Sequence, residues 1–187
     1  MIKLAALFTL LSAVSDCGQP GTTPGTTPST TPSTTLGKTI QLEKIIFHST
    51  DCFGNCPTHH LELNKDKSFK LFAEKVYNKD AAPLSQDLDK SKMGYFTGQA
   101  SDSSFNKLTH ELNTIGLDTL SFAGPEYSDG PTITIIVYYD GKRKLFQSAF
   151  PSHRSRKLIE TLYEICETKN MKGTDKKFEI ENGKDTN

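Results

Sequence analysis

Two cysteines in a short motif are the residues of this sequence whose types and spacing could most readily do chemistry. Cys52 and Cys56 are separated by three residues in the run Cys-Phe-Gly-Asn-Cys-Pro. Such a pair can close a local disulfide, exchange electrons as a dithiol or bind a soft metal ion. Gly54 permits a tight turn between the cysteines, and Pro57 fixes the entry into the next segment. In an oxidising compartment we expect a structural disulfide, which contributes on the order of 2 kcal/mol by loop closure.

Thiol-redox chemistry or metal handling is the alternative function for this pair. Copper(I) and zinc favour thiolates, and His48, His59 and His60 could add imidazole ligands. Consecutive side chains of a strand point to opposite faces, so at most one of His59 and His60 could join the cysteines. A reactive thiolate also needs a source of pKa depression such as a helix N-terminus, and the segment after the motif alternates like a strand. We therefore favour the disulfide over a metal site that uses His48 or His59.

The amino-terminal segment indicates where the protein resides. Lys3 precedes an apolar stretch, residues 4–14, which has the length of a secretory signal and is too short to span a bilayer comfortably. Residues 14–17 resemble a bacterial lipobox, in which Cys17 would become the lipidated first residue. Asp16 departs from that pattern because the residue before the cysteine is normally small and uncharged. Ordinary cleavage before Asp16, giving a periplasmic or secreted protein, is the alternative.

A threonine- and proline-rich segment follows the signal. Residues 18–35 contain no apolar side chain to bury, and proline at about every fourth position forbids a helix. We expect an extended tether that holds a domain away from a membrane. The predicted organisation is a signal peptide at 1–16, a tether at 17–37, one domain at 38–169 and a charged, disordered tail at 170–187.

The overall charge argues against a nucleic-acid partner. The chain has 22 lysine and arginine residues and 22 aspartate and glutamate residues, which are interspersed rather than blocked. No nucleophile elbow, phosphate-binding loop or His-Glu-x-x-His motif is present in the sequence. We therefore assign no catalytic residue and no cofactor, and favour a non-enzymatic protein.

Hydrophobic patterning predicts an α+β domain. Strands are expected at 39–49, 58–64, 69–77, 94–98, 132–139 and 143–150, and helices at 101–115 and 155–168. Hairpin turns imply a mostly antiparallel sheet of about six strands in the order β-β-β-β-α-β-β-α. The two amphipathic helices should cover one face of this sheet. Cys166 falls on the apolar face of the last helix and is expected to be buried.

Three runs of residues together resemble a known family. They are Cys52-Phe53-Gly54-Asn55-Cys56-Pro57 after an isoleucine-rich strand, Gly94-Tyr95-Phe96-Thr97-Gly98 before a helix, and Asp129-Gly130-Pro131 before a threonine-rich strand. Over residues 40–167 this pattern is similar to a domain of unknown function, number 6438, of exported bacterial proteins. By this resemblance Gly54, Pro57 and Asp129 are signature residues. His59 stands where the family usually has an aromatic residue.

The resemblance implies no known reaction. We expect an exported, lipid-anchored protein of the bacterial cell envelope whose domain is a binding or structural module. Its partners would be a membrane, through the lipid, and an unknown protein or small molecule.

Overall fold

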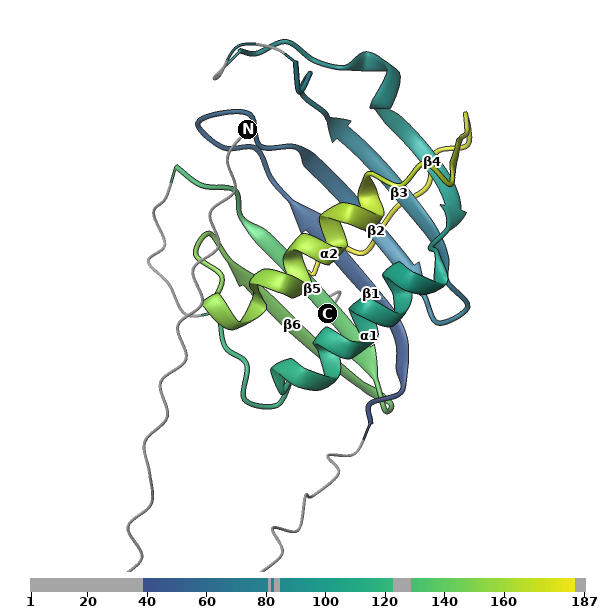
Figure 1. The fold of residues 1–187 in the computed structure, drawn as a ribbon, viewed down its shortest axis with the longest axis vertical. Helices are drawn as coiled ribbons and strands as arrows, with labels where there is room; N and C mark the ends of the chain where they lie inside the picture. Colours follow the sequence, from purple (N-terminus) through teal and green to yellow (C-terminus); the bar gives the residue numbers. More distant parts are fainter. Residues whose placement is uncertain (1–38, 81, 83–84, 123–128, 184–187) are drawn as a thin grey trace, which may run out of the picture. The chain divides into compact units, whose positions relative to one another are not determined.

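Seven antiparallel strands form one sheet in the part of the chain that the structure, a computed structural model, describes: residues 39–80, 82, 85–122 and 129–183 (Figure 1). The strand order is β6-β5-β1-β2-β3-β4-β7. The strands are β1 Leu42–Ser49, β2 Thr58–Asn64, β3 Ser68–Lys75, β4 Gly94–Gln99, β5 Ile133–Tyr139, β6 Lys142–Ser148 and β7 Met171–Gly173. The predicted signal, tether and Cys17 lie outside the described residues.

The central strands are β1 and its two neighbours. Ile45 and Phe47 point to one face of the sheet, pair with Val137 and Ile135 of β5 across the ladder, and are fully buried. Branched and aromatic side chains suit such a pleated, covered surface. The predicted α+β class is therefore confirmed, with one strand more than the expected six.

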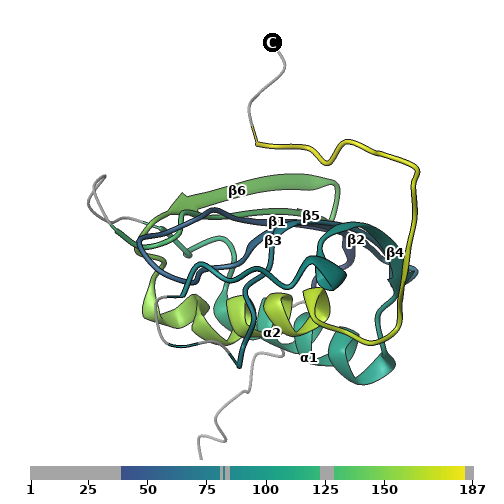
Figure 2. The same ribbon diagram turned by 90° about the horizontal axis from the view of Figure 1, so that it is seen from above.

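Two helices, α1 Asp102–Ile115 and α2 Arg156–Cys166, pack on this face (Figure 2). Ser101 begins α1, since its Oγ accepts a hydrogen bond of 3.1 Å from the Ser104 N–H, and Gly116 ends α1 with a φ of 70°. Short 3₁₀ helices lie at η1 Lys90–Lys92 and η2 His153–Ser155. In the described residues we find no helix with the length and hydrophobicity that a membrane span requires.

The carboxy-terminal segment corrects the prediction of a disordered tail, as far as residue 183. Met171 and Gly173 pair with Gly98 and Phe96 of β4, and the chain then crosses the face of the sheet opposite the helices (Figure 2). A few side chains of this segment make the contacts that order it. These side chains stand within a run of charged residues, so the sequence pattern does not mark them. Residues 184–187 lie outside the described part.

Candidate functional site

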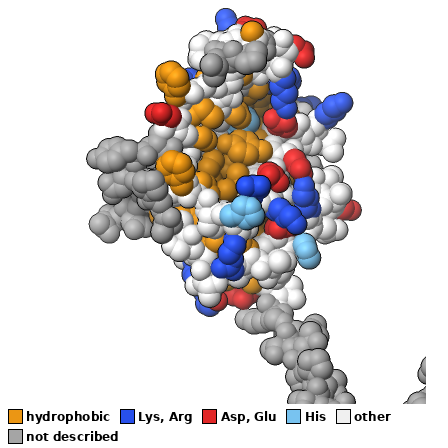
Figure 3. Space-filling model, turned by 60° about the vertical axis from the view of Figure 1, so that its left-hand side comes forward, with side chains coloured by type: hydrophobic (Ala, Val, Ile, Leu, Met, Phe, Trp, Pro, Cys, Tyr) orange, Lys and Arg blue, Asp and Glu red, His pale blue; other side chains and the backbone are white. Residues whose placement is uncertain are grey.

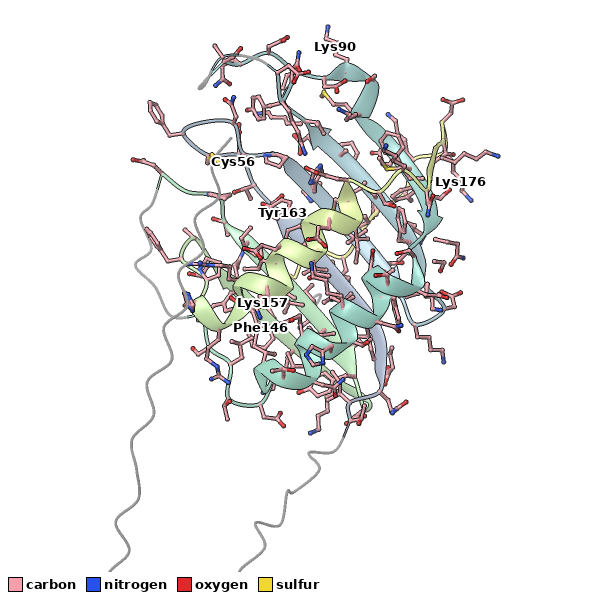
Figure 4. All side chains as sticks on the ribbon, in the orientation of Figure 1. Cys56, Lys90, Phe146, Lys157, Tyr163 and Lys176 are labelled. Atoms are coloured by element: carbon pink, nitrogen blue, oxygen red, sulfur yellow. A yellow bond between two sulfur atoms is a disulfide. The ribbon has the colours of Figure 1, made fainter. Side chains whose placement is uncertain are left out.

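The cysteine motif forms a closed loop at one end of the sheet. Cys52 and Cys56 are disulfide-bonded, with their Cα atoms 5.6 Å apart (Figure 4). β2 begins at Thr58, directly after Pro57, so a strand and not a helix follows the second cysteine. The pair therefore lacks the helix N-terminus that would activate a thiolate. The structure supports the predicted local disulfide between β1 and β2.

Hydrogen bonds hold this loop against its neighbours. The Phe53 N–H donates to the Asp129 carbonyl over 2.9 Å, which ties two of the predicted signature segments together. Ser49 Oγ donates to the Pro57 carbonyl over 2.8 Å and accepts from the His59 N–H over 3.1 Å. Ser49 is fully buried, and the sequence analysis did not identify it.

Asp51 anchors the same loop to the end of β3. Its carboxylate accepts hydrogen bonds from Lys75 Nζ and, over 3.2 Å, from the Tyr77 hydroxyl. The bond from Lys75 is the largest cause of a lowered pKa of Asp51. These contacts fix the base of the loop. The side chain of Phe53 projects from the loop and is 87% exposed.

The candidate histidine ligands are divided between the two faces of the sheet. His48 and His60 are paired across β1 and β2, and their Nδ1 atoms are 2.8 Å apart on the face opposite the helices. His59 points to the helix-covered face and is 2% exposed. Among the described residues, no three His, Cys, Asp or Glu side chains are grouped to hold a metal ion. The metal site considered from Cys52, Cys56, His48 and His59 is therefore not assembled, because strand alternation separates the histidines.

A cavity of about 430 Å³ lies beside His59, where α2 ends. Its lining includes the apolar or weakly polar side chains of Val76, Phe96, Cys166 and Met171, and the charged side chains of Lys79, Lys92, Glu167 and Lys169. An ion pair of 2.7 Å joins Lys79 to Glu167. The cavity therefore combines mostly apolar walls with charged groups that reach solvent.

The imidazole of His59 is the unusual polar group of this cavity. Its Nδ1 atom is buried and has no hydrogen-bond partner among the described residues. Burial, by removing water from the charged form, is the main cause that lowers the pKa of His59 to about 4. The ring is therefore neutral at neutral pH, and its Nδ1 can donate or accept one hydrogen bond, according to the tautomer.

Cys166 lines the same cavity as a free, buried thiol. Burial raises its pKa, so the sulfur stays protonated and is a poor nucleophile. This agrees with the predicted burial of Cys166 on the apolar face of α2.

A second cavity, of about 340 Å³, connects the cysteine motif with this region. Asn55 and Pro57 line it together with Val76, Lys79 and Glu167, which also line the first cavity. Within the part of the chain that the structure describes, Asn55 Oδ1 is buried without a hydrogen-bond partner, like the Nδ1 of His59. Figure 3 shows hydrophobic side chains gathered on one face of the molecule, with charged side chains beside them. Nothing in the sequence pattern marks Asn55 as a site residue.

Comparison with known proteins assigns the family. No curated protein matches this chain. The family model described as Domain of unknown function (DUF6438) matches residues 43–168, which is more than half of the chain. This match spans the disulfide loop, both helices and the strands from β1 to β6. The chain belongs to the DUF6438 family.

Proposed function

We propose that this chain is an exported bacterial protein, lipid-anchored to an envelope membrane through Cys17, whose DUF6438 domain is a non-enzymatic binding module. The signal-like segment, the lipobox-like residues before Cys17 and the polar tether support the anchor. The Cys52–Cys56 disulfide supports an oxidising compartment. The domain would bind a small molecule beside His59.

The unpartnered Nδ1 of His59 is the observation that carries the binding role. Nearly all buried polar atoms in proteins are hydrogen-bonded, because an unsatisfied one costs about 1–3 kcal/mol. Here such an atom belongs to a side chain that lines a cavity of about 430 Å³, within the size range of small-molecule pockets. A ligand whose hydrogen-bonding group reaches this nitrogen, with a small adjustment of the buried ring, would satisfy it.

The chemistry of the walls narrows the class of ligand. Val76, Phe96 and Met171 would contact an apolar body, and the neutral ring of His59 would bind a hydroxyl, carbonyl or amide group. Lys79 is already paired with Glu167, so a strongly charged ligand is not required. The proposed ligand is a small, largely apolar molecule with one polar group.

Native mass spectrometry of the chain purified from cells that export it tests this binding role. We expect a small-molecule adduct on the wild type and on the control Glu160→Gln, which changes an exposed residue of α2. Val76→Trp, which fills the space shared by both cavities, should lose the adduct while keeping the same far-ultraviolet spectrum. A wild type without any adduct, or an adduct unchanged by Val76→Trp, would contradict the proposal.

Intact mass spectrometry of the same material tests the anchor. The expected mature chain begins at Cys17, carries an acyl mass, and is two hydrogens lighter at the Cys52–Cys56 pair. Cys17→Ser should abolish the acyl mass and release the protein from the membrane fraction. A wild-type chain that begins unmodified at Asp16 would show secretion without an anchor.

A further inference from the structure

Residues 174–183, here called the C-terminal strap, run across the face of the sheet opposite the helices (Figure 2). One backbone hydrogen bond, of 2.9 Å from the Thr174 N–H to the Tyr95 carbonyl, continues the pairing of β7. Ile46 and Ile136 belong to this face by strand alternation, yet both are fully buried. The strap therefore covers apolar surface that the helices do not reach.

Two side chains hold the strap. The ring of Phe178 packs edge-on against Tyr95, with the ring centroids 5.1 Å apart. The Glu181 carboxylate accepts hydrogen bonds of 2.8 and 2.7 Å from the Tyr138 hydroxyl and of 3.1 Å from Arg143 Nε. Lys44 Nζ lies 3.6 Å from the same carboxylate. The strap is anchored at these points and not by a ladder of backbone bonds.

The backbone carbonyl of Glu181 makes a further contact, which depends on the protonation of a histidine ring. Its carbonyl oxygen lies 2.6 Å from His48 Nε2, and because a carbonyl can only accept, that nitrogen carries a hydrogen. The other nitrogen of His48, Nδ1, faces Nδ1 of His60 at 2.8 Å. One N–H···N hydrogen bond fits this gap.

The pair can therefore hold three ring hydrogens but not four. With three, one ring is charged and the other still offers a lone pair at Nδ1. With four, both rings are imidazolium and two N–H groups are forced together. The second proton can bind only if the rings separate, and His48 can then no longer hold the Glu181 carbonyl in place.

The surroundings of the pair act on the pKa of His48 in both directions. Glu74 Oε2 of β3 lies 3.4 Å from His60 Nε2. Burial lowers the pKa of His48, while Glu181 acts in the opposite sense and His60 in the same sense as burial. Other charged or titratable groups that the described residues place on this face are Glu179 of the strap, Lys44 of β1, Glu62 of β2, Lys70 of β3, Tyr138 of β5 and Arg143 of β6.

We propose that protonation of the His48–His60 pair releases the C-terminal strap and opens the groove beneath it. This groove of about 550 Å³ is lined by His48, His60, Phe72, Thr134 and Gln147 of the sheet and by strap residues that include Phe178. The rings of His60, Phe72 and Tyr95 stack in a row, with centroid distances of 5.6 and 4.5 Å. Release would expose a flat row of rings that suits a planar apolar ligand.

The direction of the pH effect follows from proton linkage. His48 takes up a proton less readily with the strap closed than with it open, since opening restores water to the ring. The closed state is therefore favoured above a pH of about 6.5, the usual pKa of histidine, and weakens below it. For one coupled proton the equilibrium shifts by up to about tenfold per pH unit.

A single tryptophan can report the release, because the natural sequence contains none. In the full chain with Phe178→Trp, we expect the emission to shift to the red and to lose intensity reversibly between pH 8 and pH 5. Adding His60→Gln should abolish this transition and keep the strap closed at both pH values. The amide of the glutamine can donate a hydrogen bond to neutral His48 or accept one from charged His48. Adding His110→Gln, on α1, should leave it unchanged.

Hydrogen exchange gives a second readout that needs no tryptophan. The exchange of residues 174–183 is compared between the wild type and His60→Gln, with both proteins always at the same pH. At pH 5.5 these residues should exchange faster in the wild type than in His60→Gln, and at pH 8 the two proteins should exchange at the same rate. The far-ultraviolet circular dichroism should stay constant. Absence of a transition in the wild type would overturn the proposal. An equal transition in His60→Gln would also overturn it, because protonation of a carboxylate would then explain the release.

Discussion

His59 shows at the residue scale how a local cost can mark a site. Its ring is 2% exposed, packs near Tyr163 with a centroid distance of 6.1 Å, and leaves Nδ1 without a partner. A phenyl ring would satisfy the same packing with no unpaired nitrogen. The histidine therefore lowers the stability of the free domain, and its side chain lines the cavity.

Replacing this histidine tests that balance. We expect His59→Phe to raise the free energy of unfolding at pH 7 by about 1 kcal/mol, because it removes a buried unsatisfied nitrogen while keeping a ring. Urea unfolding measures this change. His110→Phe, at an exposed position of α1, is the matched control and should not stabilise the protein. Destabilisation by His59→Phe would mean that the nitrogen is already satisfied.

The pH dependence of stability provides a second test of His59. Its pKa is about 4 in the folded protein and about 6.5 when unfolded, so the unfolded state binds a proton first on acidification. The free energy of unfolding should fall by up to about 3 kcal/mol from pH 6.5 to pH 4. His59→Phe should remove most of this fall, and an unchanged pH profile in the variant would contradict the assignment.

The disulfide gives a further residue-scale prediction. Cys52→Ser with Cys56→Ser should lower the free energy of unfolding by about 2 kcal/mol through loop-closure entropy, while the fold is retained because β1 and β2 remain paired. The same double variant tests the alternative of metal or redox chemistry. If it kept its stability but lost bound copper or zinc, or lost thiol-exchange activity, the structural role would be wrong.

Residue-scale features differ in how far the sequence could predict them. The spacing of Cys52 and Cys56 is local, so the disulfide could be predicted. The unpartnered nitrogen of His59 could not, because it depends on burial under α2, where Tyr163 packs near the ring from more than a hundred residues away along the chain. The signal available was a histidine where the family usually has an aromatic residue.

At the scale of elements, β4 leaves no room for a side chain at Gly98, between Phe69 of β3 and the chain that leads into β7. A Cβ atom added at Gly98 would lie 2.5 Å from the Asn170 carbonyl oxygen and 2.6 Å from Cζ of Phe69. Only a residue without a side chain fits between the sheet and the chain that leads into β7. The glycine thus permits the edge pairing from which the strap starts.

Gly98→Ala should therefore loosen this edge. We expect a loss of about 1–3 kcal/mol, the usual cost of overpacking, together with faster hydrogen exchange in β7 and the strap. Gly173→Ala, on the facing strand, is the control because its added Cβ would meet Phe96 at 3.9 Å, an ordinary contact. Equal effects of the two substitutions would show that the close approach at Gly98 is not what matters.

The elements themselves were largely predictable, with one exception at the carboxy terminus. Hydrophobic patterning predicted six strands of the sheet and placed a helix at 101–115, close to α1 at Asp102–Ile115. β7 was missed because it has three residues and pairs with a strand far away in the sequence. The strap was missed because its anchors, Phe178 and Glu181, stand within a run of charged residues.

At the scale of the whole domain, each face of the sheet is used differently. The helix-covered face holds the hydrophobic core and ends in the cavity beside His59. The opposite face carries the row of rings under the strap. A domain built in this way can bind a ligand without changing its core, which fits a module presented on a tether.

The nitrogen chemical shifts of the His59 imidazole test the central claim most directly. They should be measured in the protein as exported and again after a mild organic extraction that removes small molecules. We predict that Nδ1 of the neutral ring changes from a hydrogen-bonded to an unpaired nitrogen, while the signals of His110 stay fixed. If the His59 signals are the same before and after extraction, and no added extract shifts them, the cavity beside His59 is not a binding site.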